Sequence, residues 1–327
     1  MRYKPLGRTG FDVSSISFGA WAIGGTWGAV DDSESMRTLH RALDLGVNFF
    51  DTADVYGDGH SERLLARLRK ERREPFWVAT KIGRRSSPHT PQSYTRENLT
   101  GYVERCLKNL GVSALDLVQL HCPPTDVFYM PEVFGVLDDL VKAGKLRFYG
   151  ASVERAEEGL KALEYTGVQS LQIVFNILRQ RPAELLFPRA EERKVGILAR
   201  LPLSSGMLTG KLTKSTQFES DDHRSFNREG AAFSKGETFS GFDYEKSLGV
   251  VEKLRALLPS GMSLPELALR FIASFPAVTC SIPGARRPEQ VEQNVKASEA
   301  GPLDPALVRA LSALYDSDVK PFVHQLW

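Results

Sequence analysis

Four side chains with complementary chemistry follow three apolar, strand-like stretches of this sequence. Asp51 ends the stretch 48–51, and Tyr56 comes shortly after it. Lys81 lies in the stretch 78–83, and His121 ends the stretch 115–121. If these stretches are parallel strands of a barrel, their carboxyl ends meet on one rim, where polar residues are typically catalytic. A carboxylate, a phenol, an amine and an imidazole on that rim can protonate a carbonyl oxygen without a metal ion.

Each of these residues alone also has an ordinary structural explanation, such as a helix cap for Asp51 or a loop hydrogen bond for His121. Their joint occurrence favours catalysis. Reduction of a carbonyl needs a hydride at carbon and a proton at oxygen. A free phenol has a pKa of about 10, and a nearby ammonium lowers it because positive charge favours the phenolate. Lys81 would supply that charge to Tyr56, and Asp51 would hold Lys81 by an ion pair.

Carbonyl reduction also needs a group that orients the carbonyl and a source of hydride. His121 would orient the carbonyl or share in the proton transfer. The hydride must come from a bound cofactor, because no side chain donates one.

The elements that must position these residues form a regular alternation. Strand-like apolar runs occur near residues 16–18, 47–50, 76–79, 117–120, 148–149, 171–174, 196–199 and 278–282. Most are too apolar for a half-exposed sheet and are typical of strands covered on both faces. Helix signals lie between them: a start at Asp32, caps at Thr95 and Ser263, and C-terminal glycines at Gly46 and Gly111. Eight strands alternating with helices predict a single (β/α)8 TIM barrel, an α/β fold, as one domain over residues 1–327.

Two segments depart from this alternation. Residues 1–13 predict an N-terminal hairpin that turns at 7–10 and plugs the closed end of the barrel. Residues 212–243, rich in Ser, Asp, Gly and Phe, predict a long loop after the seventh strand. Loops of this length in compact domains are usually functional or disordered, and this one leaves the catalytic rim, so we expect a lid.

Composition excludes several classes of protein. The chain has 327 residues, 42% hydrophobic and 25% charged, with a net charge of +2. The sequence has no long basic run, so it gives no indication of nucleic acid or an anionic membrane as a partner. The start lacks an apolar signal core, and no stretch reaches the 18 or more apolar residues that a spanning helix needs. The 3 cysteines have no C-x-x-C spacing, which favours a reducing compartment. We predict a cytoplasmic protein.

With these motifs, this chain resembles members of the aldo-keto reductase superfamily. The resemblance covers nearly the whole chain, from residues 5–10 to the last helix. Residues 48–56 are similar to that family's most specific signature, and the resemblance implies a catalytic tetrad of Asp51, Tyr56, Lys81 and His121. Segments 199–206 and 222–227 are similar to its bacterial, inositol-dehydrogenase-like branch. The resemblance implies an NADP(H)-dependent oxidoreductase that reduces aldehydes and ketones to alcohols, or catalyses the reverse.

The cofactor site has candidates of its own. The G-x-G-x-x-G fingerprint of dinucleotide-binding folds is absent. The segment 205–211 is not a P-loop, because Ser205 occupies the position of that motif's first glycine and Leu212 that of its final Ser or Thr. The same small residues could wrap a pyrophosphate with backbone N–H groups, with Lys211 adding charge.

The resemblance also places the nicotinamide. It implies that Ser152 and Gln172 hold the carboxamide and that Arg200 lies beside the ring, where many relatives have a stacking aromatic. Many relatives have Asn where this chain has Val153.

Residues 284–294 resemble the family's adenosine site. A guanidinium matches the oxygens of a 2′-phosphate, and a helix starting near Pro288 would add its dipole. By themselves, Arg286 and Arg287 would be ordinary surface charges; the resemblance makes Arg286 the predicted phosphate ligand and NADP(H) the predicted cofactor. The full predicted cofactor set is Gly19, Ala20, Trp21, Asp51, Ser152, Gln172, Arg200, Leu203, Ser205, Gly206, Leu208, Gly210, Lys211, Gly284, Arg286, Gln290 and Asn294.

The predicted substrate site contains Trp21, Trp27, Tyr56 and His121. Two indoles just after the first strand can wall a pocket on the rim, although loop packing explains them almost as well. The substrate is a small carbonyl or polyol molecule, with inositol, sugars, aldehydes and ketones all open.

Two other functions fit parts of the pattern. Some members of the family are channel-associated subunits with bound cofactor, so a redox-sensing or regulatory subunit with little turnover is the main alternative. A metal-dependent hydrolase on the same barrel would use His and carboxylates from several strand ends. Of 6 histidines only His121 ends a predicted strand, and there is no H-x-H. The complete tetrad favours the reductase.

Overall fold

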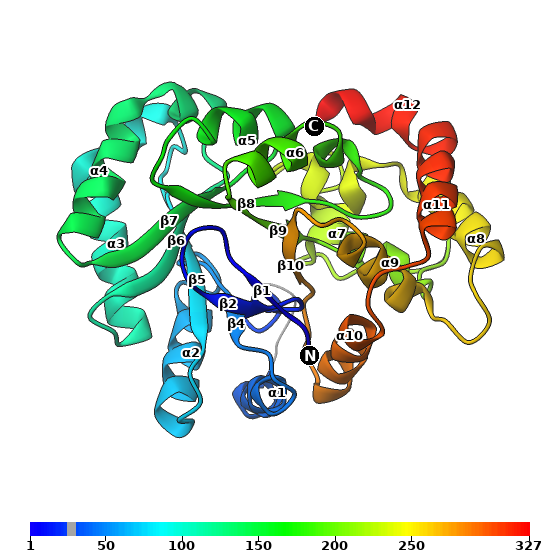
Figure 1. Cartoon of the computed structure of the whole chain (residues 1–327), viewed down its shortest axis with the longest axis horizontal. Coiled ribbons are helices and arrows are strands. Elements are labelled where there is room, and N and C mark those ends of the chain that lie inside the picture. Colours follow the sequence, from blue (N-terminus) through cyan, green and yellow to red (C-terminus); the bar gives the residue numbers. More distant parts are fainter. Residues whose placement is uncertain (25–30) are drawn as a thin grey trace.

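Eight parallel strands form the barrel of the computed structural model, which describes residues 1–24 and 31–327. They follow one another in chain order around the sheet (Figure 1). Their bounds are β3 (Phe18–Gly19), β4 (Phe49–Asp51), β5 (Trp77–Ile82), β6 (Leu115–His121), β7 (Leu146–Ser152), β8 (Val168–Val174), β9 (Gly196–Arg200) and β10 (Val278–Ile282). The predicted (β/α)8 architecture is confirmed.

The barrel closes between its first and last strands. Parallel bridges join Ile16 to Ser281 and Gly19 to Gly284. A Cβ on Gly19 would lie 3.1 Å from Ile282 Cγ2 and 3.2 Å from the Pro283 carbonyl oxygen. Glycine at this position therefore lets the two edges approach closely.

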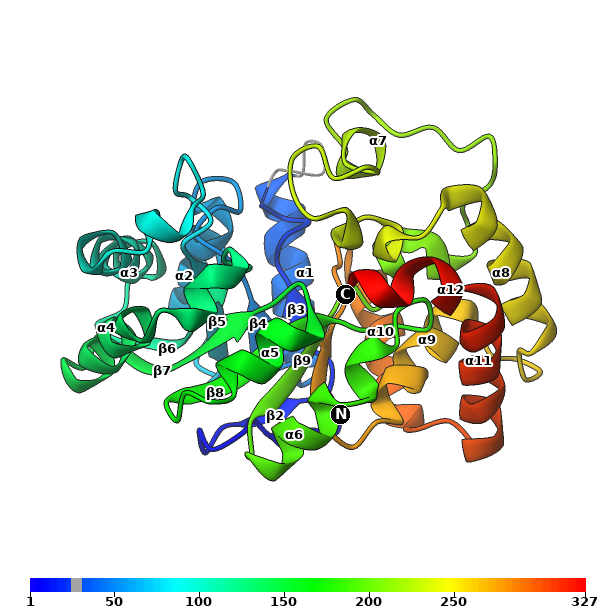
Figure 2. The same ribbon diagram turned by 90° about the horizontal axis from the view of Figure 1, so that it is seen from above.

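The N-terminal hairpin plugs one end of the barrel, as predicted. Strands β1 (Tyr3–Pro5) and β2 (Asp12–Ser14) pair antiparallel. Leu6, Phe11 and Val13 are buried with the inward-facing residues of the barrel strands, among them Phe49 and Leu117. Figure 2 shows the hairpin and helix α7 (His223–Phe226) at opposite ends of the barrel.

Helices surround the sheet, and their caps follow the sequence signals. The N-cap of the first helix is Asp31, whose side chain accepts from the Ser33 N–H, and Thr95 and Ser263 cap two others in the same way. Gly46 and Gly111 adopt the left-handed φ typical of helix ends. The helices are α1 (Asp32–Asp44), α2 (His60–Glu71), α3 (Arg96–Leu110), α4 (Pro131–Lys142), α5 (Ala156–Ala162), α6 (Leu186–Glu192), α8 (Tyr244–Ala256), α9 (Leu264–Ala273), α10 (Pro288–Ala300), α11 (Pro305–Asp318) and α12 (Lys320–Val323).

Several strands extend further than the apolar runs that predicted them. Strand β5 continues through Lys81, and β7 ends at Ser152 rather than at residue 149. The first barrel strand begins at Phe18, two residues later than the start of the predicted run. Polar side chains that face the barrel interior near the rim interrupt the apolar pattern without ending the strand.

The loop over 212–243, predicted as a lid, is partly ordered. It contains α7 and two 3-10 turns, Lys235–Glu237 and Phe239–Gly241. Residues 236–242 of the loop are buried. They are held by hydrogen bonds from Asn176 Nδ2 to Ser240 Oγ (3.0 Å) and from Arg179 Nη1 to the Gly236 carbonyl (3.2 Å). Within the described residues, no helix has both the length and the apolar character to cross a membrane.

Candidate active site

Lys81, Asp51 and Tyr56 form one hydrogen-bonded group at the rim, in which Lys81 and Asp51 are buried and Tyr56 is half-buried. Asp51 is the last residue of β4 and pairs in register with Ala79 of β5. Lys81, two residues further along β5, therefore points to the same face. Its Nζ donates to Asp51 Oδ1 (2.6 Å), to the Thr52 carbonyl (2.8 Å) and to the Tyr56 hydroxyl (3.4 Å).

The second oxygen of Asp51 is held by Gln172 of β8. Gln172 Nε2 donates to Asp51 Oδ2 (2.7 Å) and to Gln119 Oε1 (2.9 Å). A carboxylate with both oxygens bonded keeps a fixed orientation. If Gln172 also contacts a nicotinamide carboxamide, its carbonyl oxygen is the atom left for that contact.

Tyr56 is positioned by the tight turn that follows β4. Its N–H donates to the Ala53 carbonyl (3.1 Å), and the next residue, Gly57, has φ +58°. A Cβ on Gly57 would lie 1.8 Å from the Gly24 carbonyl oxygen, so only glycine fits there. The turn brings the Tyr56 ring 5.0 Å from Lys81 Nζ.

The balance of effects on Tyr56 differs from the sequence-based expectation. Burial raises the pKa of Tyr56, and the charge on Lys81 offsets only part of that increase. Lys81 does lower the pKa of Tyr56, as expected, but burial outweighs this effect and the net pKa is raised. The phenol stays protonated and available as a donor.

His121, the last residue of β6, is a buried neutral imidazole beside Tyr56. The two ring centroids lie 5.9 Å apart. Burial lowers the pKa of His121 well below its usual value, and Arg84 and Lys81 lower it further. Nε2 lies 3.4 Å from Arg84 Nη1, whereas Nδ1 has no hydrogen-bond partner in the described part of the chain.

A first cavity of about 430 Å³ runs outward from this group. Thirteen of the predicted cofactor residues line it: Gly19, Trp21, Asp51, Ser152, Gln172, Arg200, Leu203, Ser205, Gly206, Lys211, Gly284, Arg286 and Gln290. The other four, Ala20, Leu208, Gly210 and Asn294, do not line it. Ala20 and Leu208 are fully buried core residues, and Asn294 is buried on α10.

The segment 204–210 forms one wall of this cavity with an unusual backbone. Ser204, Ser205 and Gly206 all have positive φ, at 47°, 53° and 95°. The Ser205 hydroxyl donates to the Glu237 carbonyl (3.1 Å) and accepts from the Phe239 N–H (3.2 Å). Ser205 therefore attaches the lid to the cavity wall, a role that sequence reasoning missed.

The nicotinamide candidates lie at the inner end of the cavity. Ser152 Oγ lies 3.4 Å from Cys122 Sγ. Arg200 Nη2 donates to the carbonyl of Val153 (3.4 Å) and lies 3.1 Å from Glu154 Oε1. The side chain of Val153 is fully buried, so it faces the core and not the cavity.

The outer end of the cavity is positively charged. Arg224, Lys211 and Arg286 line it, and Arg224 is paired with Asp222 (2.6 Å). In the ranges that the structure describes, no carboxylate oxygen lies within ion-pair distance of the Arg286 guanidinium, and burial together with Arg224 lowers its pKa. A ligand anion would relieve this repulsion between two guanidiniums.

A glycine and the start of α10 complete this outer end. A Cβ on Gly284 would meet no protein atom closer than 3.9 Å, so the backbone there is open to a ligand. Gln290 Oε1 accepts from the backbone N–H groups of Arg286 (2.7 Å) and Arg287 (3.2 Å). These two N–H groups are occupied, so an anion here would meet cationic side chains and not these N–H groups.

A second cavity of about 340 Å³ lies on the other side of Tyr56 and His121. Its lining is Trp21, Val55, Tyr56, Arg84, His121, Asp221, His223, Phe226, Phe233 and Glu237. The Trp21 ring lies 5.1 Å from that of His223 and 6.0 Å from that of Tyr56. Trp27, the other predicted substrate residue, lies outside the described residues.

Seven residues of this lining were missed by sequence reasoning: Val55, Arg84, Asp221, His223, Phe226, Phe233 and Glu237. Five of them belong to the loop 212–243. Its length and its aromatic content indicated a lid, but single residues in such a loop carry no periodic signal.

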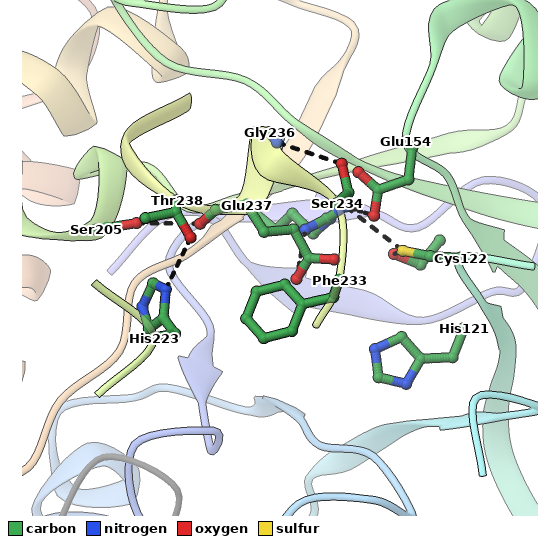
Figure 3. A network of polar contacts seen from close by, with 12 residues as sticks. His121, Cys122, Glu154, Ser205, His223, Phe233, Ser234, Gly236, Glu237 and Thr238 are labelled. Carbon is green, nitrogen blue, oxygen red and sulfur yellow. Dashed lines mark hydrogen bonds and ion pairs between the residues drawn. The ribbon is translucent and has the colours of Figure 1, made fainter. Parts of the chain in front are cut away.

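A network of charges joins the two cavities under the lid. Glu237 lies 3.0 Å from Arg84 Nη2 and 3.5 Å from Arg200 Nη1. Figure 3 shows Glu237 close to Glu154 and Cys122, beside His121. The nearest ligand atoms of Cys122, Glu154 and Glu237 lie within 4.8 Å of one another, a spacing that a metal ion could use. The two carboxylates, however, are already paired with guanidinium groups.

Known proteins are similar to this chain in sequence and in fold. Residues 15–316 match the model of the Aldo/keto reductase family. Aldo-keto reductase YhdN of Bacillus subtilis (strain 168) is 32% identical over 298 residues, covering 89% of this chain and 87% of that protein. The NADH-specific methylglyoxal reductase of Escherichia coli (strain K12) is 29% identical over 318 residues, 91% and 93% of the two chains. A probable voltage-gated potassium channel subunit beta of Arabidopsis thaliana is 28% identical over 323 residues, 93% of each.

Solved structures agree. The holo form of an aldo-keto reductase from Bacillus halodurans superposes with a TM-score of 0.78 at 27% identity, over 96% of both chains. A glycerol dehydrogenase from Gluconobacter oxydans gives a TM-score of 0.78 at 29% identity, over 97% of this chain and 96% of the other. With the matched family model and the barrel that carries the four rim residues, the chain belongs to the aldo/keto reductase family.

Proposed function

We propose that this protein is an NADP(H)-dependent oxidoreductase that reduces aldehydes or ketones to alcohols, or catalyses the reverse, with Tyr56 as the proton donor. One observation carries the proposal: Tyr56 and His121 line both cavities. A carbonyl compound in the second cavity and a nicotinamide in the first would meet at these two residues.

The chain's own residues supply the proton and the orientation. The cofactor, when bound, supplies the hydride. Tyr56 donates its proton to the carbonyl oxygen, and Lys81 stabilises the phenolate that remains, because its ammonium lies 3.4 Å from the hydroxyl. Asp51 keeps Lys81 charged: burial disfavours the ammonium, but Asp51 and Tyr56 together raise the pKa of Lys81. Neutral His121 orients the substrate oxygen.

The choice of NADP(H) rests on Arg286. The positively charged outer end of the first cavity suits a 2′-phosphate, since guanidinium and phosphate form strong charge-assisted hydrogen bonds. The NADH-specific relative shows that cofactor preference differs within the family. Ser152, Gln172 and Arg200 are the proposed contacts of the nicotinamide, and Lys211 and Gly206 those of the pyrophosphate.

A regulatory subunit is the second candidate. It is favoured by similarity to proteins named as probable potassium channel subunits. Such a protein would bind the cofactor with little turnover. The inositol-dehydrogenase-like branch and a cytoplasmic location remain predictions.

Two measurements test the proposal together. A nicotinamide fluorescence titration should show NADPH binding, and a panel of aldehydes, ketones and polyols should reveal turnover. Binding without turnover of any compound would favour the regulatory subunit, and the absence of binding would contradict both functions.

A further inference from the structure

The second cavity is lined by few charged side chains, and acidic residues outnumber basic ones among them. Arg84 and the carboxyl groups of Asp221 and Glu237 are the sources of formal charge in its described lining. Burial raises the pKa of Glu237, and Arg84 opposes that increase, so the ion pair favours the charged form of this carboxyl. His121 and His223 add none, because burial lowers the pKa of His223 to about 4 and that of His121 well below its usual value. An anionic substrate would therefore depend on Arg84 for its partner.

Arg84 is already paired with Glu237. Both terminal nitrogens of Arg84 donate to Glu237 Oε1 at 3.0 Å. Its Nη1 also lies 3.4 Å from His121 Nε2, so this cation stands at the catalytic end of the cavity. No other carboxylate forms an ion pair with Arg84 in the part of the chain that the structure describes.

Glu237 cannot easily move away from Arg84. Its Oε1 contacts Arg84, while its Oε2 lies 3.5 Å from Arg200 Nη1. Its backbone is fixed as well, because its carbonyl accepts from Ser205 and its N–H donates to the Ser234 carbonyl (3.0 Å). The side chain is only 7% exposed. A substrate carboxylate would have to displace a buried, doubly paired group.

We propose that Glu237 is a specificity-determining residue that neutralises Arg84 and thereby restricts the substrate cavity to uncharged carbonyl compounds. This inference rests on the proposed reductase function and goes beyond it. The mechanism is rejection: an anion beside Glu237 and Asp221 meets like charge and finds no unpaired cation.

The test compares 4-nitrobenzaldehyde with 4-carboxybenzaldehyde, which have similar shape and differ in charge. The wild type should reduce the nitro compound with at least about tenfold higher kcat/KM. Glu237→Gln keeps the side-chain shape and releases Arg84, so the ratio should shift at least about tenfold toward the carboxylate, the size expected for one charge-assisted hydrogen bond. Adding Arg84→Gln should abolish that shift.

Glu154→Gln is the matched control. It removes a carboxyl group that pairs with Arg200, interacts electrostatically with Glu237 and does not line the second cavity. It therefore tests whether the loss of any carboxyl group of this cluster produces the same shift. Because both substrates are measured with saturating cofactor, any effect of this variant on the cofactor cancels from the ratio. Equal use of both aldehydes by the wild type, or the same ratio in Glu237→Gln and Glu154→Gln, would overturn the inference and leave the reductase function standing.

A binding measurement covers the case in which the reductase function fails. Benzoate binding to the NADPH-loaded protein can be followed by the fluorescence of Trp21, which lines the cavity. Glu237→Gln should bind benzoate at least about tenfold tighter than the wild type and than Glu154→Gln. Unchanged affinity would overturn the role of Glu237 without any turnover being measured. Circular dichroism should show that each variant is folded.

Discussion

The ammonium of Lys81 lies 2.6 Å from Asp51 Oδ1, in an ion pair that joins β5 to β4 with 1% and 5% of the two side chains exposed. Removing one partner of such a deeply buried ion pair lowers the free energy of unfolding by about 3–5 kcal/mol, because the remaining charge is left uncompensated. The pair therefore affects both stability and catalysis, and the two effects can be separated.

Lys81→Met should reduce activity and stability together. The double change Lys81→Met with Asp51→Asn should recover most of the lost stability, because no uncompensated carboxylate remains and Gln172 can still donate to the amide oxygen. It should not recover activity, since the phenolate of Tyr56 still lacks a cation. Thermal or urea unfolding checks this; equal stability of the single and double variants would contradict the ion pair.

Arg286→Ala should weaken NADPH binding selectively. The wild type should bind NADPH at least about tenfold tighter than NADH, and the variant should lose most of that difference because the 2′-phosphate loses its guanidinium. Arg287→Ala is the control, since Arg287 is the neighbouring arginine and does not line the cavity. Fluorescence titration gives both affinities, and equal wild-type affinities for the two cofactors would exclude the proposed contact.

Asp54→Asn should stabilise the protein above neutral pH. Asp54 is fully buried and both its oxygens lack a hydrogen-bond partner among the described residues. Burial, with Glu62 as the next cause, raises its pKa to about 7. The pKa of Asp54 in the folded protein exceeds its value of about 3.9 in the unfolded chain. Ionisation of Asp54 therefore destabilises the folded state. Wild-type stability should fall as pH rises from about 4 to 7 by up to roughly 4 kcal/mol.

The measurement is urea unfolding of both proteins at pH 5 and pH 8. The advantage of Asp54→Asn over the wild type should be larger at pH 8. Asp126→Asn, at an exposed position, serves as the control. An advantage that does not change with pH would show that Asp54 is not the buried acid described here.

Much of the fold and the core of the site could be predicted because their signals are local. Apolar runs marked the strands, cap residues marked the helices, and polar residues at, near or shortly after strand ends marked the four rim candidates. The contact between Arg84 and Glu237 could not be predicted from the sequence. It joins residues 153 positions apart, and no local pattern near one residue indicates the other. The sign of the Tyr56 pKa shift also needed the structure, since sequence suggests a nearby cation but not the extent of burial. The assignment of residues 1–327 to one domain stays a prediction.

The most direct test of the account is the reduction of 4-nitrobenzaldehyde by Tyr56→Phe with saturating NADPH. The change removes one hydroxyl and keeps the ring that packs beside Trp21 and His121. Because the proton donor is lost, kcat should fall by about two orders of magnitude or more, while the affinity for NADPH, measured in the same samples by fluorescence, stays nearly unchanged. A variant with near-normal turnover would contradict Tyr56 as the proton donor.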